Sequence, residues 1–301
     1  MAIVLGPNQY GKAETRVVRI YRDGDRHEIR DLNVSTSLRG DFAAAHLTGD
    51  QASVLPTDSQ KNTCFAYAKE HGVGEIEDYA LALASHFVDD IAPVYRARVD
   101  VDEYRWERVS VAGAEHPHAF VRAGHEVRTA CVTTDAERAV NASWVISGIR
   151  DLVVLKSTGS EFTGFLRDRY TTLAEATDRI LATSLTVRWR YAGTDVAWGE
   201  AFGQVRQILL ERFARVHSLA LQQTLWEMGS AVLAARDDIA EIRLSAPNKH
   251  HFLADLTPFG LDNPGEVFHA ADRPYGLIQA AVLRDDAPPA GPAWESPGAF
   301  C

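Results

Sequence analysis

The spacing of apolar residues runs through the same order of elements twice, and this repeat constrains the fold more than any other feature of the sequence. Residues 15–40 alternate between apolar and polar on both sides of a charged Asp-Gly turn, which predicts a hairpin. Residues 64–72 and 75–90 then carry apolar side chains at helical spacing. Alternation returns over residues 93–113 and 118–134 and predicts a second, long hairpin around the sequence His-Pro-His.

The second half repeats this order, with strand patterns on either side of two amphipathic helices, at residues 144–158, 179–191, 199–218, 219–238 and 239–256. Both halves therefore read ββααββ, which indicates a tandem duplication with a period of about 140 residues. We expect an α+β fold with a first unit at residues 1–138, a second at 139–285 and a Pro-rich surface tail at 286–301. No linker rich in Pro, Gly or Ser divides the halves, so one antiparallel sheet with four helices on a single face is predicted.

Such a sheet has consequences for assembly. Helices on one side leave the other face and the edges without a partner, and long exposed edges favour aggregation. Closing the sheet into a barrel of several subunits removes these edges. The pattern therefore predicts an oligomer.

Composition excludes several classes of partner. The chain has 301 residues, 46% of them hydrophobic, and a formal charge of −10 without a basic block, which argues against nucleic acid and anionic membranes. A small anionic substrate remains compatible, because a pocket needs only one or two local cations. Three scattered cysteines do not make a disulfide framework, and no basic leader followed by an apolar run is seen at the N-terminus. We expect a cytoplasmic protein.

The histidines do not form a recognisable metal motif. His116, His118 and His125 fall in one hairpin, while His250 and His251 are adjacent and would point to opposite faces of a strand. There is no His-Glu-x-x-His, no Cys-x-x-Cys and no glycine-rich phosphate loop. No metal and no nucleotide cofactor are therefore expected.

The remaining polar residues each have an ordinary structural explanation when taken singly. Lys12 lies where a strand begins, and surface lysines are common. Thr57 and Asp58 precede a helical pattern and fit an N-terminal turn whose side chains cap the helix. Asn248 and His250 fit the end of a strand. Arg179 fits an exposed surface position, and Gln222 fits the first turn of a helix.

Together, four segments resemble the urate oxidase (uricase) family: "QYGKAETRV" at 9–17, "LPTDSQKNT" at 55–63, "EFTGFLRDRYTTLAEATDRILAT" at 161–183 and "SAPNKHHF" at 245–252. They follow the family's order and spacing, and the resemblance extends from about residue 8 to residue 269. It implies two tandem tunnelling-fold (T-fold) units per subunit and a homotetrameric barrel. It also implies active sites between subunits, with the Thr-Asp segment supplied by the neighbour.

The resemblance implies how the substrate, urate, is held. Arg179 matches the arginine that grips one edge of the purine, since a planar guanidinium offers two parallel donors. Gln222 matches the glutamine on the opposite edge, and Phe162 the ring that stacks on the purine plane. Leu221 and Asp58 match positions that contact the substrate through the backbone, and the Asp58 side chain is expected to cap the helix or to form a salt bridge across the interface.

The resemblance also implies a proton relay. Lys12 and Thr57 match the catalytic pair, with His250 completing the relay and Asn248 beside the O₂ position. Urate itself is then the reductant of O₂, so that no cofactor is needed and the products are 5-hydroxyisourate and H₂O₂.

Two other functions stay open. A catalytically silent purine- or pterin-binding assembly could use the same T-fold, because a fold does not fix a function. A T-fold cyclohydrolase would need a zinc site, for which this sequence shows no His/Cys cluster. The chain ends in "SPGAFC" rather than in a peroxisomal signal, which suggests a bacterial, cytoplasmic enzyme.

Overall fold

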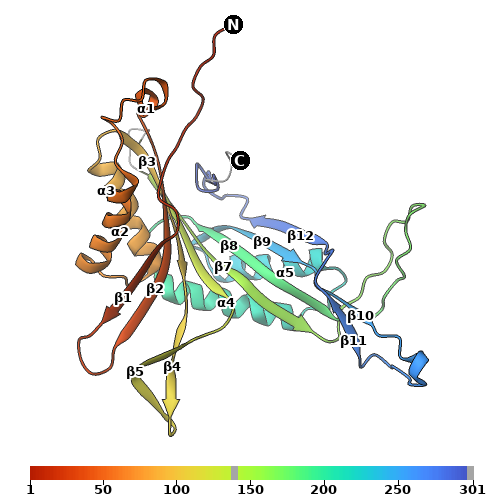
Figure 1. Ribbon diagram of the computed structural model, residues 1–301. Helices are drawn as coiled ribbons and strands as arrows, with labels where there is room; N and C mark the ends of the chain where they lie inside the picture. Colours follow the sequence, from red (N-terminus) through yellow and green to blue (C-terminus); the bar gives the residue numbers. More distant parts are fainter. Residues whose placement is uncertain (137–141, 297–301) are drawn as a thin grey trace. The chain divides into compact units, whose positions relative to one another are not determined.

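The computed structural model describes residues 1–136 and 142–296, and an eight-stranded sheet is its largest element (Figure 1). Hydrogen bonding orders the strands β1-β2-β3-β6-β7-β8-β9-β12. Their bounds are Thr15–Tyr21, Glu28–Gly40, Val94–Glu103, Val127–Asp135, Ala142–Lys156, Leu181–Tyr191, Ile239–Pro247 and Leu277–Leu283. Two smaller antiparallel pairs are β4 (Trp106–Val111) with β5 (Ala114–Arg122), and β10 (His250–Leu253) with β11 (Phe268–Ala271). The predicted α+β class with an antiparallel sheet is confirmed.

The helices are α1 (Ala43–Leu47), α2 (Thr57–Glu70), α3 (Ile76–Asp89), α4 (Trp198–Arg215) and α5 (Leu221–Ala235), with a short 3-10 helix η1 (Thr257–Phe259). Among the described residues, no helix is both long enough and apolar enough to cross a membrane.

The chain divides into two compact units, of which the first comprises Met1–Gly148, Arg190–Gly199 and Pro288–Cys301. β1 and β2 form the predicted hairpin, in a register that pairs Thr15 with Val34 and Tyr21 with Glu28. The helix α3 packs on β3 and β6. Apolar side chains that alternate along β2 are fully buried, as are those on one side of α3, namely Leu32, Val34, Leu38, Ile76, Leu83 and Phe87.

Three boundaries in this unit differ from the predictions. The long hairpin exists, but it is split into the pair β3–β6 and the separate pair β4–β5. Its turn lies at Ala112 and Gly113, which both have positive φ, so His116 and His118 belong to strand β5. The helix α2 begins at Thr57, well before the apolar pattern that announced it.

The second unit comprises Ile149–Trp189 and Glu200–Ala287. β9 and β12 pair antiparallel, and α5 packs on both. The contact is close because Gly229 of α5 has no side chain: a Cβ there would lie 2.7 Å from Val282. The core includes side chains from α5, β8 and β9, namely Leu185, Val187, Leu225, Met228, Val232, Ile242 and Leu244.

The C-terminal strap, residues 288–296, packs on the first unit instead of forming the predicted surface tail. Ala293 is 1% exposed and lies in an apolar cluster with Cys131, Ile146, Trp144 and Trp294. The prediction failed because the partners of the strap are far away in the sequence. The repeat boundary at 138/139 and the last five residues, 297–301, lie outside the described residues.

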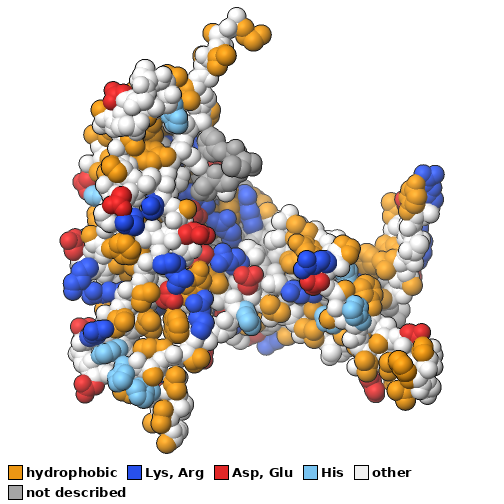
Figure 2. All heavy atoms as spheres, viewed as in Figure 1, with side chains coloured by type: hydrophobic (Ala, Val, Ile, Leu, Met, Phe, Trp, Pro, Cys, Tyr) orange, Lys and Arg blue, Asp and Glu red, His pale blue; other side chains and the backbone are white. Residues whose placement is uncertain are grey.

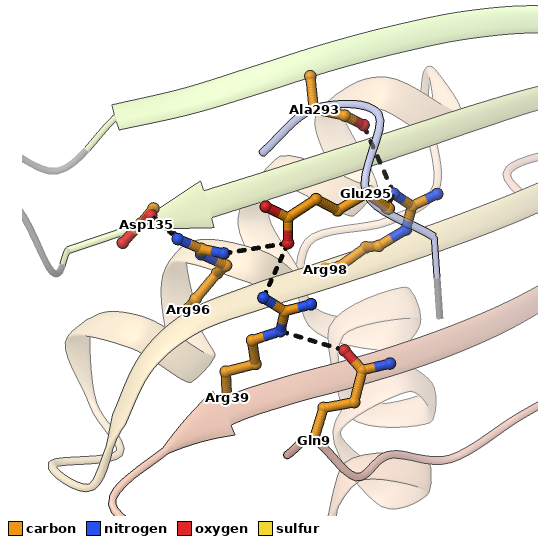
Figure 3. A network of polar contacts seen from close by, with 7 residues as sticks. All are labelled: Gln9, Arg39, Arg96, Arg98, Asp135, Ala293 and Glu295. Carbon is orange, nitrogen blue, oxygen red and sulfur yellow. Dashed lines mark hydrogen bonds and ion pairs between the residues drawn. The ribbon is translucent and has the colours of Figure 1, made fainter. Parts of the chain in front are cut away.

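Three arginines hold the end of this strap (Figure 3). The Glu295 carboxylate accepts from Arg39 at 2.8 Å and from Arg96 at 3.3 Å. Arg98 donates to the backbone carbonyl of Glu295 and forms a bidentate pair with Asp100. The strap therefore contributes both apolar burial and a carboxylate to the first unit.

Candidate functional site

Lys12 is held against strand β2 by its backbone. The Thr36 N–H donates to the Lys12 carbonyl (2.9 Å), and two residues earlier Tyr10 and Leu38 exchange backbone bonds (3.1 and 2.8 Å). This approach needs a residue without a side chain at Gly11, where a Cβ would lie 1.8 Å from the Thr36 carbonyl oxygen. The Lys12 backbone is therefore fixed, while its half-buried side chain projects from the strand entrance.

Thr57 is the first residue of α2, after Pro56 at the N-cap, and no side chain caps this helix. The predicted capping role of Thr57 and Asp58 is therefore wrong, because both residues lie inside the first turn. The exposed Asp58 carboxylate instead pairs with Lys61 of the same helix and accepts from Asn62 (3.0 Å). Lys61 lowers the pKa of Asp58, and the charge of Lys12 adds to this shift.

Arg179 and Phe162 lie together in the second unit. The guanidinium carbon of Arg179 is 5.2 Å from the centroid of the Phe162 ring, which also stacks on Phe165 at 4.9 Å. Burial lowers the pKa of Arg179, and its Nε is buried without a hydrogen-bond partner. A buried donor without a partner costs free energy unless a ligand or water accepts from it. The pair thus offers an aromatic face beside an unsatisfied cationic donor.

His250 lies within electrostatic range of the same arginine. Burial lowers the pKa of its imidazole, and the charges of Arg179 and His251 lower it further. The neutral ring is therefore favoured near pH 7 and can accept a proton. Asn248 is placed two residues earlier by a bridge to Thr183 and by its N–H bond to the Gly276 carbonyl (2.8 Å).

A set of hydrogen bonds joins the segments that carry Gln222 and Arg179. The Arg179 N–H donates to the Ser160 carbonyl (2.7 Å), and Ser160 forms a bridge with Ser218. Thr224 of α5 donates to the Ser218 hydroxyl (2.8 Å), which ties the first turn of α5 to this segment. Leu221 in that turn is buried and Gln222 is exposed. These bonds connect the segment that carries Arg179 to the helical turn that carries Gln222.

Histidines also gather between the β1–β2 turn and the β4–β5 hairpin (Figure 2). The His118 ring lies 5.8 Å from His27 and 4.5 Å from His116, measured between centroids. Within the described part of the chain, no group of three His, Cys, Asp or Glu side chains has the arrangement needed to hold a metal ion.

Sequence reasoning missed two residues that lie beside the Lys12 and Thr57 segments, namely Thr36 and Gln60. Both are buried, and their side chains bond to each other at 2.7 Å. Gln60 follows Thr57 by three residues, which places it near Thr57 on a helix. Because nothing in the sequence marks Thr36 as its partner, the pair could not be found from the pattern.

Comparison with known proteins gives a consistent result. The family model described as Uricase matches residues 8–133 and 145–279. Uricase from Arthrobacter globiformis is 51% identical over 300 residues, covering 99% of this chain and 96% of that protein. Uricase from Danio rerio is 37% identical over 281 residues, covering 91% and 93%.

Solved structures agree with this. The crystal structure of uricase from Arthrobacter globiformis matches with a TM-score of 0.93 at 50% identity, covering 98% of this chain and all of that one. The structure of a uricase from Bacillus fastidious matches with a TM-score of 0.82 at 24% identity, covering 94% and 96%. The second match shows likeness of fold alone.

Proposed function

The chain belongs to the uricase family, and from this we propose that it oxidises urate with O₂. The membership predicted from four short segments is thereby confirmed. The reaction is urate + O₂ + H₂O giving 5-hydroxyisourate + H₂O₂, which belongs to purine degradation. The observation that carries the proposal within the structure is the buried, unpartnered Nε of Arg179 beside the Phe162 ring.

These two residues suit a planar anionic purine. The ring of Phe162 stacks on the purine plane and fixes its orientation with little loss of side-chain entropy. Arg179 then donates two parallel bonds to one edge, satisfying the orphan Nε. Gln222 binds the opposite edge, since its amide donates and accepts at once. The backbones of Leu221 and Asp58 complete the contacts.

Lys12, Thr57 and His250 form the proton relay, which withdraws a proton from bound urate. The electron-rich purine passes one electron to O₂, which is held beside the ring near Thr57 and Asn248. Recombination at C5 forms a C–O bond and gives a peroxide. The relay then returns the proton, the peroxide leaves as H₂O₂ together with both electrons, and water adds at C5 to give 5-hydroxyisourate. The favoured neutral state of His250 supports its part as an acceptor.

The assembly that goes with this chemistry is a homotetrameric barrel of two tandem T-fold units per chain, with active sites between subunits. Exposed apolar side chains on loops and on η1 of the second unit support it, at Leu166, Tyr170, Leu173, Phe259 and Leu261. Large exposed apolar surface commonly marks a protein interface. The location that we infer for the assembly is cytoplasmic, as the composition predicts.

The direct test follows urate absorbance in the near ultraviolet, with and without a chelator, together with H₂O₂ formation. Loss of urate with one H₂O₂ per urate, unchanged by the chelator, is the expected result. No loss of urate despite its binding would instead support the silent purine- or pterin-binding assembly.

Shared sites can be tested with two inactive parents. Arg179→Ala and Thr57→Ala variants should each be inactive, and mixed tetramers should regain part of the activity, because some sites then combine two intact halves. A mixture that exchanges subunits but regains no activity would contradict sites shared between subunits.

A further inference from the structure

A buried chain of hydrogen bonds joins the backbone of Lys12 to the helical turn that carries Thr57. The Lys12 N–H donates to Thr36 Oγ1 (3.2 Å), and the Thr36 hydroxyl donates to Gln60 Oε1 (2.7 Å). A hydroxyl has one proton and two lone pairs, so it can do both at once. The two hydrogen bonds therefore link the Lys12 backbone to Gln60 of α2 through Thr36 of strand β2.

A second connection joins the same two segments. The Tyr10 hydroxyl donates to the Leu55 carbonyl (3.0 Å), and the Gln60 side-chain amide also points to that carbonyl at 3.5 Å. Tyr10 lies two residues before Lys12, and Leu55 lies two residues before Thr57. Both ends of the proposed Lys12–Thr57 pair are thus tied through buried or half-buried polar groups.

Burying the polar side chains of Thr36 and Gln60 costs free energy unless each polar group forms a hydrogen bond. Thr36 is 5% exposed and Gln60 is 0% exposed, while the other buried residues of α2, Cys64 and Ala68, are apolar or nearly so. An apolar side chain at position 60 would avoid the cost of burying an amide. Buried polar groups that are fully bonded fix one geometry, whereas apolar packing tolerates small shifts. The buried amide of Gln60 therefore indicates that the position of this helical turn must be fixed.

We propose that Thr36 and Gln60 are positioning residues, which set the register between the Lys12 segment and the first turn of α2 and thereby the proton transfer of the Lys12–Thr57 pair. This rests on the proposed function. The bonds act on the Lys12 backbone and on the helix, and neither residue needs to touch urate. Displacing a relay group by about 1 Å can cost roughly 100-fold in rate.

The test compares Thr36→Val, which removes the hydroxyl at nearly constant shape, with Thr36→Ser, which keeps it. Thr36→Val should lower kcat about 10- to 100-fold, with KM for urate and the Kd for urate measured without O₂ within about threefold. Thr36→Ser should keep most of the kcat of the unaltered protein, because it retains the hydroxyl. Gln60→Met removes the acceptor from the other side and should give the same loss, even if Thr36→Val fails to fold.

Thr133→Val is a matched control. Thr133 is an equally buried threonine of the same unit, 2% exposed, whose hydroxyl has no hydrogen-bond partner. Its change to valine should leave kcat and KM unaltered. The double variant Thr36→Val with Gln60→Met should be no slower than the slower single variant, because both remove the same connection.

The outcomes separate the two claims. If the unaltered protein oxidises urate and both Thr36→Val and Gln60→Met keep full kcat in folded tetramers, the positioning inference is overturned and the proposed function stands. A rise in KM and Kd at constant kcat would also overturn it, because the pair would then act on binding. If the unaltered protein does not oxidise urate, the function and the inference fall together.

Discussion

The C-terminal strap allows the contributions of charge and apolar packing to be compared. Glu295 pairs with Arg39 and Arg96, but its carboxylate is 48% exposed. Solvent screening limits each such pair to about 1 kcal/mol at most, so Glu295→Gln should weaken the docked strap by ~1–2 kcal/mol. This corresponds to a roughly 5- to 30-fold rise in the equilibrium constant for strap opening.

Packing should contribute more. Trp294 is partly buried against the cluster that contains Ala293 and Trp144. Fully buried tryptophans lose about 3–5 kcal/mol on change to alanine, and we expect ~2–3 kcal/mol for Trp294→Ala because part of the ring stays in water. At tenfold per 1.4 kcal/mol, this is a roughly 30- to 150-fold rise in opening. Trp294→Ala should therefore release the strap more than Glu295→Gln.

Hydrogen exchange measures this opening directly. The amides of Ala293 and Glu295 donate to the carbonyls of Ala290 and Pro292 (3.1 and 3.0 Å), and they exchange when the strap detaches. In 1 M salt the Debye length falls to about 3 Å, so the effect of Glu295→Gln should largely vanish while that of Trp294→Ala remains. Glu107→Gln, which removes a single exposed pair with Arg105, is the control.

Two results would refute this reasoning. A change of less than about twofold for Glu295→Gln at low salt would show that the two ion pairs contribute nothing measurable. A larger effect for Glu295→Gln than for Trp294→Ala would show that charge, not packing, holds the strap.

Three further expectations concern titratable groups. Replacing Arg179 by Gln should raise the pKa of His250, because a nearby positive charge disfavours the imidazolium, and an NMR titration showing no upward shift would contradict this. Glu77→Ala should lower the free energy of unfolding in urea by about 3 kcal/mol, since it removes a fully buried carboxylate that pairs with Arg128 at 2.7 Å and accepts from the Ser147 hydroxyl at 2.5 Å, although Arg128 keeps Glu75 at 2.6 Å; an unchanged midpoint at equal protein concentration would contradict it. Burial raises the pKa of Cys64 to about 12, so this thiol should resist iodoacetamide at pH 8 until the protein unfolds, and rapid labelling of the native protein would exclude such burial.

Local periodicity predicted most of the sheet and the helices, because a buried face must repeat every two or every 3.6 residues. Periodicity failed where the apolar alternation continued from the end of one strand into the next. Alternation runs through β3 and β4 without interruption, although the two strands pair with different partners. The start of α2 was also missed, because its first turn is polar and only Gln60 in it is buried.

The candidate site depended on a different kind of signal. Lys12, Thr57, Arg179 and His250 are unremarkable singly, and only their joint resemblance to one family selected them. The structure adds what the sequence cannot show, such as the unpartnered Nε of Arg179 and its position over the Phe162 ring. Such features depend on burial, which arises from contacts between distant segments.

The docked strap also bears on how the chain matures. Arg98 and its strap partner Glu295 are 197 residues apart, and the first unit combines early strands with residues 288–296. During synthesis the ribosome releases the N-terminal strands long before the strap is made. Cys131 and Ile146 therefore lack their packing partners in the strap until then. Contacts of such long sequence separation form slowly, and an incomplete core exposes apolar surface. Residues 288–296 thus determine when the first unit is finished, and chains truncated near residue 287 should be the ones that chaperones retain.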